Sequence, residues 1–462
     1  MRSRIVAVLG VVALVASACS GTTASATPGA STAATTAPSA AAGSTTPSAG
    51  AGTFLERALA GEFKGKHVTA TGPFVDEDAV KFNATMKEFT DKTGIIIDYA
   101  GTKQFEAVIS AEVDGNNAPD IADFPQPGLL ANFAKTGKVI DLSKHLNMDA
   151  LKANYGQSWL DMATMAGASG DIMAGIWERV NGKSFVWYPK KAFDAAGYKV
   201  PTTWAELQAL QDQIVADGDT PWCIGIESGV ATGWPVTDWL EEFMLRTTSL
   251  DNYDKWVTNE LKFSSPEVKA AAEKVGEIFL NPKLVNGGTA GIVGTAFGDA
   301  PKAMFTNPPK CWLHRQGNFI TSFFPATAKS GVDYDVFYLP GIDPAQGSPV
   351  LIAGDIWAAF SDKPEALAIM EYFTKGEHLK SWIQSGGAIG PQKDVDLSWY
   401  SDPTTAFVAK TIVNAPSVRF DASDLMPGAV GSGAEWKEFT SWISGKEDLD
   451  TALKNIDAAW PK

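Results

Sequence analysis

The sequence is poor in the residues and motifs on which many enzyme active sites depend. Its four histidines stand far apart, at positions 67, 145, 314 and 378, and neither an HExxH motif nor a CxxC pair offers zinc-site spacing. A G-x-S-x-G nucleophile elbow is also missing. Gly182-Lys183-Ser184 fails as a phosphate-binding loop, because Trp177 stands where that motif needs glycine. We therefore expect no catalytic residues, no metal site and no cofactor.

Positive charge and cysteine are also scarce. Lysine and arginine number 38 against 53 acidic residues, so the formal net charge is −15. A chain this acidic is unsuited to binding nucleic acid or anionic lipid through its surface. The three cysteines are Cys19, Cys223 and Cys311. If Cys19 is modified, the other two form an even pair, which favours a disulfide in an oxidising compartment; two separate buried thiols are the alternative.

The N-terminus is the one place with a marked apolar run. Arg2 and Arg4 precede the apolar segment from Ile5 to Ala16, which is too short to span a bilayer of roughly 30 Å. This order is typical of a secretory signal over residues 1–18. Cys19 directly follows Ala16-Ser17-Ala18, which resembles a bacterial lipobox. We expect an extracytoplasmic protein that a lipid on Cys19 anchors to the cell membrane; an ordinary signal peptide with a chance cysteine is the alternative.

Residues 20–52 contain only Ser, Gly, Thr, Ala and Pro. Such a stretch buries too little apolar surface to offset its ordering entropy, so residues 19–52 are interpreted as a lipidated cysteine followed by a disordered tether. A flexible coil of this length spans on the order of 30 Å, which suits a tethered monomer. Residues 53–462 are too many for a single core, so two lobes are expected.

Strand and helix patterns alternate at the start of the folded part. His67–Thr71 and Ile95–Ile97 are predicted strands, Glu77–Lys92 and Thr102–Asp114 are predicted helices, and a short strand ends at Phe124. This alternation predicts an α/β fold with a mostly parallel sheet covered on both faces. Binding sites in such sheets form at the carboxyl ends of the strands, which here are Gly72–Phe74 and Asp123–Gln126.

Further elements are predicted along the chain. Phe185–Tyr188 is a predicted strand and Lys190–Ala196 a short helix. Thr203 and Glu206 form a capping box that opens a helix burying Trp204, Leu207, Leu210 and Ile214. Ser265-Pro266 and Lys363-Pro364 open helices that run to Phe279 and Phe373, and the pattern after residue 376 is mainly helical.

Three ordered segments carry a family resemblance. They are Lys92-Thr93-Gly94-Ile95 with Ala118-Pro119-Asp120-Ile121, then Trp187-Tyr188-Pro189-Lys190-Lys191 with Pro201-Thr202-Thr203-Trp204-Ala205-Glu206-Leu207, and Ile352-Ala353-Gly354-Asp355 with Lys363-Pro364-Glu365-Ala366. Together they resemble the extracellular solute-binding proteins of sugar ABC importers, the group that includes maltose-binding protein. Pro221–Gly225 and Lys310–Gln316 are similar to the alpha-glucoside-binding branch of that group.

The resemblance implies a two-lobed periplasmic-binding-protein fold. Lobe one would take about 63–178 and 333–375, and lobe two about 179–332 and 376–462. A sugar, expected to be an alpha-glucoside or related oligosaccharide, would bind between the lobes, and their closure would signal to ABC permease subunits. A cell-surface glycoside hydrolase is the alternative, although any chain with 53 acidic residues contains carboxylate pairs at hydrolase spacing.

Candidate ligand contacts follow from the chemistry of a sugar. Aromatic rings suit its apolar face, and carboxylates, amides and arginine suit its hydroxyls. Gly354 and Asp355 form the strongest pair, because glycine permits close approach and Asp355 is expected to end a strand. The candidates are Phe74, Asp123, Phe124, Glu227, Trp234, Asp238, Trp239, His314, Gln316, Gly354, Asp355, Trp357, Arg419 and Asp421.

Several candidates also have a structural alternative. Tryptophan is often core, Asp123 could cap the next helix, and Asp238 could favour the start of its helix through the dipole. Arg419 and Asp421 could form a buried salt bridge. For His314 and Gln316, the resemblance implies sugar contacts from the turn after the strand around Trp312.

Overall fold

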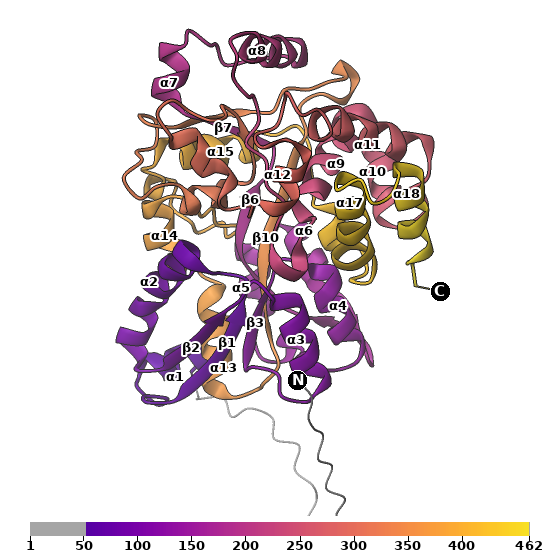
Figure 1. Cartoon of the computed structure of the whole chain (residues 1–462). Helices are drawn as coiled ribbons and strands as arrows, with labels where there is room; N and C mark the ends of the chain where they lie inside the picture. The colour runs from indigo at the N-terminus through magenta and orange to yellow at the C-terminus, as the bar shows by residue number, and fades with distance from the viewer. Residues whose placement is uncertain (1–51, 462) are drawn as a thin grey trace, which may run out of the picture. The chain divides into compact units, whose positions relative to one another are not determined.

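The computed structural model describes residues 52–461 (Figure 1). The predicted signal peptide, the lipidation site Cys19 and almost all of the predicted tether lie outside the described residues. Between residues 52 and 461, no helix combines the length and the apolar character needed to cross a membrane.

The described chain opens with the predicted alternation of strands and helices. Strand β1 (His67–Gly72) pairs in parallel with β2 (Ile96–Gly101) and with β3 (Ile121–Phe124). Helices α2 (Asp76–Thr93) and α3 (Phe105–Asp114) connect these strands and pack against them. Helix α2 ends at Gly94, whose φ of 72° is a conformation that glycine adopts without steric cost. These predicted elements are confirmed.

Strands from distant parts of the chain complete this sheet. β10 (Val350–Ala359) is antiparallel to β3 and to β6 (Ile176–Gly182), and parallel to β11 (Val418–Phe420). The order is β11-β10-β3-β1-β2, with β6 also paired to β10. The sheet is therefore mixed, because β10 runs against β3. In Figure 1, β6 and β10 run side by side from the half holding β1–β3 into the other half.

A second, smaller sheet has the order β8-β7-β9. Its central strand β7 (Phe185–Tyr188) has the predicted bounds and is antiparallel to β8 (His314–Arg315) and β9 (Asp335–Tyr338). Helix α8 (Trp204–Ala216) begins at the predicted capping box between Thr203 and Glu206. Three of its four predicted core residues are buried, whereas Trp204 is only half-buried.

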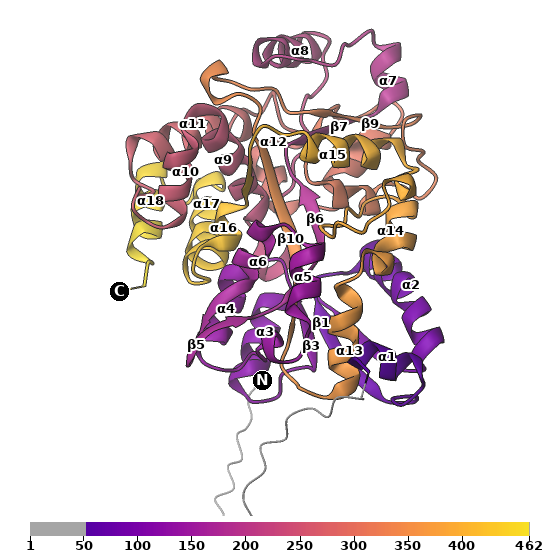
Figure 2. The same cartoon turned by 180° about the vertical axis from the view of Figure 1, so that it is seen from behind.

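The helices predicted to open at Pro266 and Pro364 are present. The segment after residue 376 is mainly helical, as predicted, and β11 is its one strand among the described residues. The elements not yet given are α1 (Phe54–Leu59), α4 (Pro127–Lys135), α5 (Met148–Asn154), α6 (Gln157–Ala163), β4 (Thr164–Gly167), β5 (Gly170–Met173), α7 (Lys190–Ala195), α9 (Trp234–Thr247), α10 (Leu250–Val257), α11 (Pro266–Phe279), α12 (Gly288–Gly294), α13 (Pro364–Phe373), α14 (Lys380–Ser385), α15 (Pro403–Val413), α16 (Ala422–Leu425), α17 (Trp436–Ile443) and α18 (Leu449–Ala458). In Figure 2 the C-terminal helices α17 and α18 lie beside α9 and α11, which they contact.

Buried apolar side chains gather into two cores. One contains the buried apolar side chains of β1, β3, α2 and α13, and the other contains those of α8, α9 and α11. β10 contributes to both, with Leu351 in the second core and Ile356 in the first. Two cores joined by shared strands suit a two-lobed chain, and the lobe boundaries given above stay a prediction.

Cys223 and Cys311 form a disulfide, with a sulfur–sulfur distance of 2.02 Å. The predicted pairing is confirmed, and the alternative of two separate thiols is wrong. The bond joins the segment before α9 to the segment that leads into β8, which lie 88 positions apart in the sequence.

Candidate functional site

A large cavity lies at the carboxyl ends of β1 and β3. It encloses about 920 Å³ of empty space, part of which is open to solvent. Pro73 and Phe74 follow β1, Pro125 and Gln126 follow β3, and all four line the cavity. The cavity therefore lies at the edge of the sheet where the sequence predicts a site.

Three polar residues along β6 line one side of this cavity. Arg179, Asn181 and Lys183 alternate along the strand and just beyond it, and alternate residues of a strand face the same side. All three are buried. A buried cation is costly unless it is paired, so Arg179 and Lys183 both need partners.

Arg179 is held by carboxylates and aromatic rings. Its Nε donates to Asp355 Oδ2 at 2.5 Å, and its Nη2 donates to Asp78 Oδ2 at 3.2 Å. The guanidinium carbon lies 4.4 Å from the ring centroids of both Phe74 and Trp382. Burial opposes the charge, but the two carboxylates outweigh it and raise the pKa of Arg179. The guanidinium is therefore a fixed cation beside the cavity.

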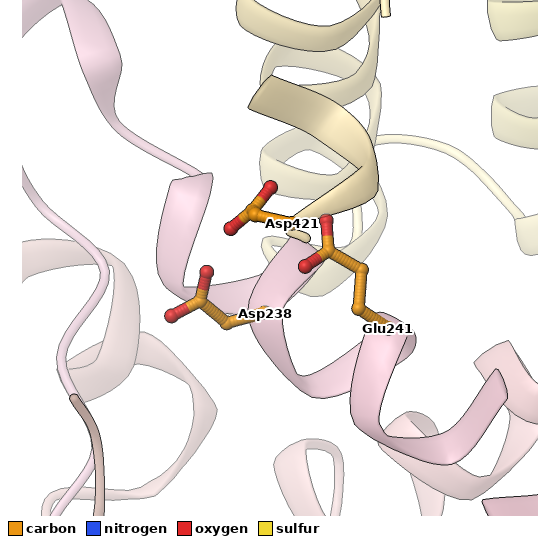
Figure 3. A group of neighbouring side chains, drawn as sticks. All are labelled: Asp238, Glu241 and Asp421. Carbon is orange, nitrogen blue, oxygen red and sulfur yellow. The ribbon is translucent and has the colours of Figure 1, made fainter. Parts of the chain in front are cut away.

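Lys183 joins two further acids. Its Nζ lies 2.8 Å from Asp238 Oδ1 and 2.5 Å from Asp421 Oδ2. Figure 3 shows Asp238 and Glu241 on α9 with their carboxyl groups directed toward Asp421, and ligand oxygens from all three come within 4.8 Å of one another. Such a cluster has the composition of a cation site, but the Lys183 ammonium already supplies the positive charge between Asp238 and Asp421.

Carboxyl groups around this cluster differ in their protonation. Burial raises the pKa of Asp238 to about 6 and that of Glu106 to about 7. Burial and the Asp421 charge raise the pKa of Glu241 and of Asp424 well above the usual range. Burial also acts to raise the pKa of Asp421, but Lys183 and accepted hydrogen bonds lower it overall. Near neutral pH the site therefore offers both protonated and ionised carboxyl groups, which donate and accept hydrogen bonds.

Aromatic side chains also line the cavity. Trp234 and Phe297 have ring centroids 5.1 Å apart, and Phe319 lies 6.0 Å from Trp234. All three are half-buried and line the cavity, so part of each ring is open to it. Lys183 Nζ lies 5.3 Å from the Trp234 ring centroid, which brings the charged and aromatic parts of the site together.

The structure brings six of the fourteen candidate ligand contacts to this cavity, namely Phe74, Trp234, Asp238, Gly354, Asp355 and Asp421. Two of them have a different local position from the one expected. Asp355 lies in the middle of β10 rather than at a strand end, and Asp238 lies in the second turn of α9. Gly354 is required by packing, because a Cβ there would lie 2.8 Å from the Arg179 carbonyl oxygen.

The other candidates lie elsewhere. Glu227 lines a second cavity, and the residues before it, Cys223–Ile226, form no strand. His314 belongs to β8, and its Nδ1 lies 2.7 Å from the Cys223 carbonyl oxygen. Arg419 pairs with Asp254 near the surface. The remaining five, Asp123, Phe124, Trp239, Gln316 and Trp357, are buried and line neither cavity.

Sequence reasoning missed much of the β6 side of the cavity. Arg179, Asn181 and Lys183 are spaced two apart, and this alternation is a strand signal that could have placed them on one face. Phe297 and Phe319 carry no such signal, because they stand in irregular or 3₁₀ segments. Asp78 looks like an ordinary acidic residue in the first turn of a helix.

Comparison with known proteins decides the family. Residues 75–377 match the family model described as bacterial extracellular solute-binding protein. The chain belongs to this family. Its members are solute receptors, so the expectation that the chain is not an enzyme is confirmed and the hydrolase alternative is wrong.

Two relatives are similar to this chain over most of its length. The osmoprotective compounds-binding protein GgtB of Synechocystis sp. is 42% identical over 397 residues, covering 86% of this chain and 93% of the relative. The alpha-glucosides-binding periplasmic protein AglE of Rhizobium meliloti is 39% identical over 404 residues, covering 86% and 88%.

The fold of this family member is also found in solved structures. The bacterial solute receptor AcbH, described as preferring β-D-galactopyranose, superposes with a TM-score of 0.73 at 18% identity. The match covers 85% of this chain and 98% of AcbH. At this identity the likeness shows the fold alone, and it confirms the expected periplasmic-binding-protein fold.

Proposed function

We propose that the chain is the carbohydrate receptor of an ABC importer and that it takes a neutral alpha-glucoside or a related oligosaccharide. The observation that carries this proposal is one cavity that is lined both by aromatic rings and by a row of paired charges. A sugar has an apolar face of C–H groups and a rim of hydroxyls, and these two surfaces match the two kinds of side chain that line the cavity. The name of one relative, the alpha-glucosides-binding protein AglE, supports the same class of ligand.

The hydroxyls of a sugar would complete the hydrogen bonding of the site. Among the described residues, Arg179 Nη1, Asp78 Oδ1 and Gln126 Oε1 are buried and have no partner, and all three residues line the cavity. An unmet buried polar group costs about 1–3 kcal/mol, so a ligand that supplies partners gains affinity. Of the candidate contacts, we propose Phe74, Trp234, Asp238, Gly354, Asp355 and Asp421 as ligand residues, joined by Arg179, Asn181 and Lys183.

Thermal unfolding of the full chain against a panel of solutes tests this function. The panel contains maltose, trehalose, sucrose, longer alpha-glucosides, other sugars, glycerol phosphates and glycine betaine. A ligand at 100 times its dissociation constant stabilises the fold by about 2.7 kcal/mol, which gives a clear shift in melting temperature. We expect a response to at least one alpha-glucoside, recovered chemically unchanged.

Two tryptophan variants make the test specific to the cavity. Trp234→Ala should abolish the shift, whereas Trp204→Ala, on the half-buried face of α8 away from both cavities, should keep it. A response to glycine betaine alone would contradict the carbohydrate proposal. Recovery of cleaved ligand would contradict a receptor role.

We further propose that the chain acts as a monomer held at the outer face of the cell membrane by a lipid on Cys19. The lipobox-like Ala16-Ser17-Ala18-Cys19 and the uncharged tether support this arrangement. Replacing Cys19 with serine should move the protein from the membrane fraction to the medium. If the variant stays with the membrane, the lipid anchor is wrong.

A further inference from the structure

A row of buried charges runs from the larger cavity into the interior of the protein. Asp238, Glu242 and Arg246 stand four residues apart on α9, so their side chains lie along one face of this helix. Arg315 on β8 reaches the same face. Its Nη1 lies 3.3 Å from Asp238 Oδ2, and its Nη2 donates to Glu242 Oε1 at 2.9 Å. Glu242 also pairs with Arg246. Of these four residues only Asp238 lines the cavity.

The signs of these charges alternate around Asp238. Its carboxyl group lies between two cations, the Arg315 guanidinium and the Lys183 ammonium, and none of the three side chains is more than 7% exposed. A buried charge is costly unless it is paired. Lys183 is shared with Asp421, so the two acids would have one cation between them if Arg315 did not supply a second.

The fold fixes Arg315 outside the cavities. The residue pairs with Val186 of β7, and its guanidinium carbon lies 5.8 Å from the Trp239 ring centroid. Arg315 lines neither cavity. An effect of Arg315 on a ligand must therefore pass through the residue between them, which is Asp238.

The protonation of Asp238 depends on this arrangement. Burial raises the pKa of Asp238 to about 6, although the charges of Lys183 and Arg315 act to lower it. Without Arg315 the pKa of this carboxyl group should be higher still. The other acidic groups that act on Asp238 or line the same cavity are Asp421, Asp424, Glu241 and, on α3, Glu106.

We propose that Arg315 is a positioning residue for the ligand site, which keeps Asp238 ionised and fixed so that its carboxylate can accept a hydrogen bond from a ligand hydroxyl. This inference rests on the proposed carbohydrate function, in which Asp238 is a ligand residue. An ionised carboxylate accepts stronger hydrogen bonds than a protonated one, and it also keeps its salt bridge to Lys183.

Calorimetric titration of the full chain with maltose between pH 5 and pH 9 tests the proposal. In the unmodified protein the affinity should fall by about tenfold as pH drops through the pKa of Asp238, near 6. Arg315→Gln keeps a donor for Glu242 but removes the charge. It should move the midpoint of this loss upward by at least about one pH unit, and the affinity should recover to within about threefold at pH 9.

Three further variants separate charge from structure. Arg315→Lys restores the positive charge and should return the midpoint to within about half a pH unit of its original value. Arg419→Gln makes the same change in an arginine that pairs with Asp254 near the surface and lines neither cavity, so the midpoint should not move. In an Asp238→Asn background, Arg315→Gln should no longer shift the pH profile, because the two residues act as a unit.

Two outcomes of the titration overturn the role of Arg315. One is an equal loss of affinity at every pH in Arg315→Gln, which indicates a purely structural effect, and the other is an unchanged midpoint. If Arg315→Gln fails to fold, Glu242→Gln provides the opposite test. This variant removes the acid that competes for Arg315, so the midpoint should move to lower pH.

Urea unfolding over the same pH range reports on Asp238 without any sugar. Because its pKa is higher in the folded chain than in the unfolded one, its proton stabilises the fold at low pH, and this contribution is lost as pH rises through about 6. The difference between each protein and its Asp238→Asn counterpart isolates this loss, which Arg315→Gln should extend to higher pH. Identical unfolding profiles with and without Arg315 overturn its role, whereas failure of maltose to bind at every pH counts against the proposed function alone.

Discussion

Lys183 forms salt bridges to two acidic residues that, like it, line the larger cavity. Its Nζ contacts Asp238 and Asp421, and all three side chains are buried. Lys183→Met keeps the length of the side chain but leaves two carboxyl groups without their cation. Removing one partner of a buried pair typically costs about 3–5 kcal/mol, so we expect a loss of this size in the free energy of unfolding, measured in urea.

A surface lysine provides the matched control. Lys191 pairs with Asp333 at 2.6 Å, but the lysine side chain is 69% exposed. Lys191→Met should cost no more than about 1 kcal/mol, because water screens exposed pairs. Similar losses in the two variants would contradict a special role for Lys183 in holding the site together.

Glu178 gives the fold a stability that depends on pH. This side chain on β6 is fully buried, and its Oε2 accepts a hydrogen bond from Trp357 Nε1 at 2.9 Å. Burial raises its pKa from 4.5 to about 8, so the folded chain keeps a proton that the unfolded chain releases. The contribution of this proton to stability is present below pH 4.5 and is lost as pH rises toward 8.

Glu178→Gln removes this proton equilibrium and keeps the shape of the side chain. Between pH 6 and pH 9 the unmodified protein should lose about 2 kcal/mol more unfolding free energy than the variant. Urea unfolding at several pH values measures both curves, and groups that titrate equally in both proteins cancel in the difference. Parallel curves would show that Glu178 is ionised in the folded chain at neutral pH.

At the scale of the elements, the sequence predicts local features such as helix ends better than it predicts which strands pair. The capping box at Thr203 and the glycine stop at Gly94 act within one turn of a helix, so the sequence alone reveals them. The pairing of β6 with β10 joins residues about 175 positions apart, and no local pattern encodes it. This is why Asp355 was expected at a strand end, whereas the partner strands extend β10 on both sides of it.

The pairing of β6 with β10 also explains why residue 354 is glycine. A Cβ at this position would lie 2.8 Å from the Arg179 carbonyl oxygen and 3.1 Å from the Trp177 ring. Gly354→Ala should therefore force these strands apart and lower the unfolding free energy by about 1–3 kcal/mol. Gly294→Ala is the control, because nothing lies within 4 Å of the added methyl group, and its effect should stay within about 0.5 kcal/mol. Equal unfolding midpoints for the two variants would show that the strands tolerate the methyl group.

At the scale of the whole molecule, we expect the charge of the chain and of its larger cavity to restrict the class of ligand. The chain carries a net charge of −15. Its larger cavity contains three cations, Lys103, Arg179 and Lys183, and each of them lies within 3.6 Å of a carboxylate. The acidic composition was evident from the sequence, but the pairing of these cations depends on the fold. A phosphate entering this cavity would meet more acidic side chains than cations, and each of these cations already has an acid beside it.

We therefore expect the receptor to reject anionic sugars. A maltose phosphate should bind more than about 100-fold more weakly than maltose, because like charges brought together cost several kcal/mol. Asp78→Asn removes one partner of Arg179 and should narrow this difference, whereas Asp254→Asn, whose partner Arg419 lies near the surface, should not. Competition titrations at low and at high salt measure the difference. Since burial shields the cavity from salt, most of the discrimination should persist at high salt; its disappearance there would assign selection to the surface charge rather than to the paired cations.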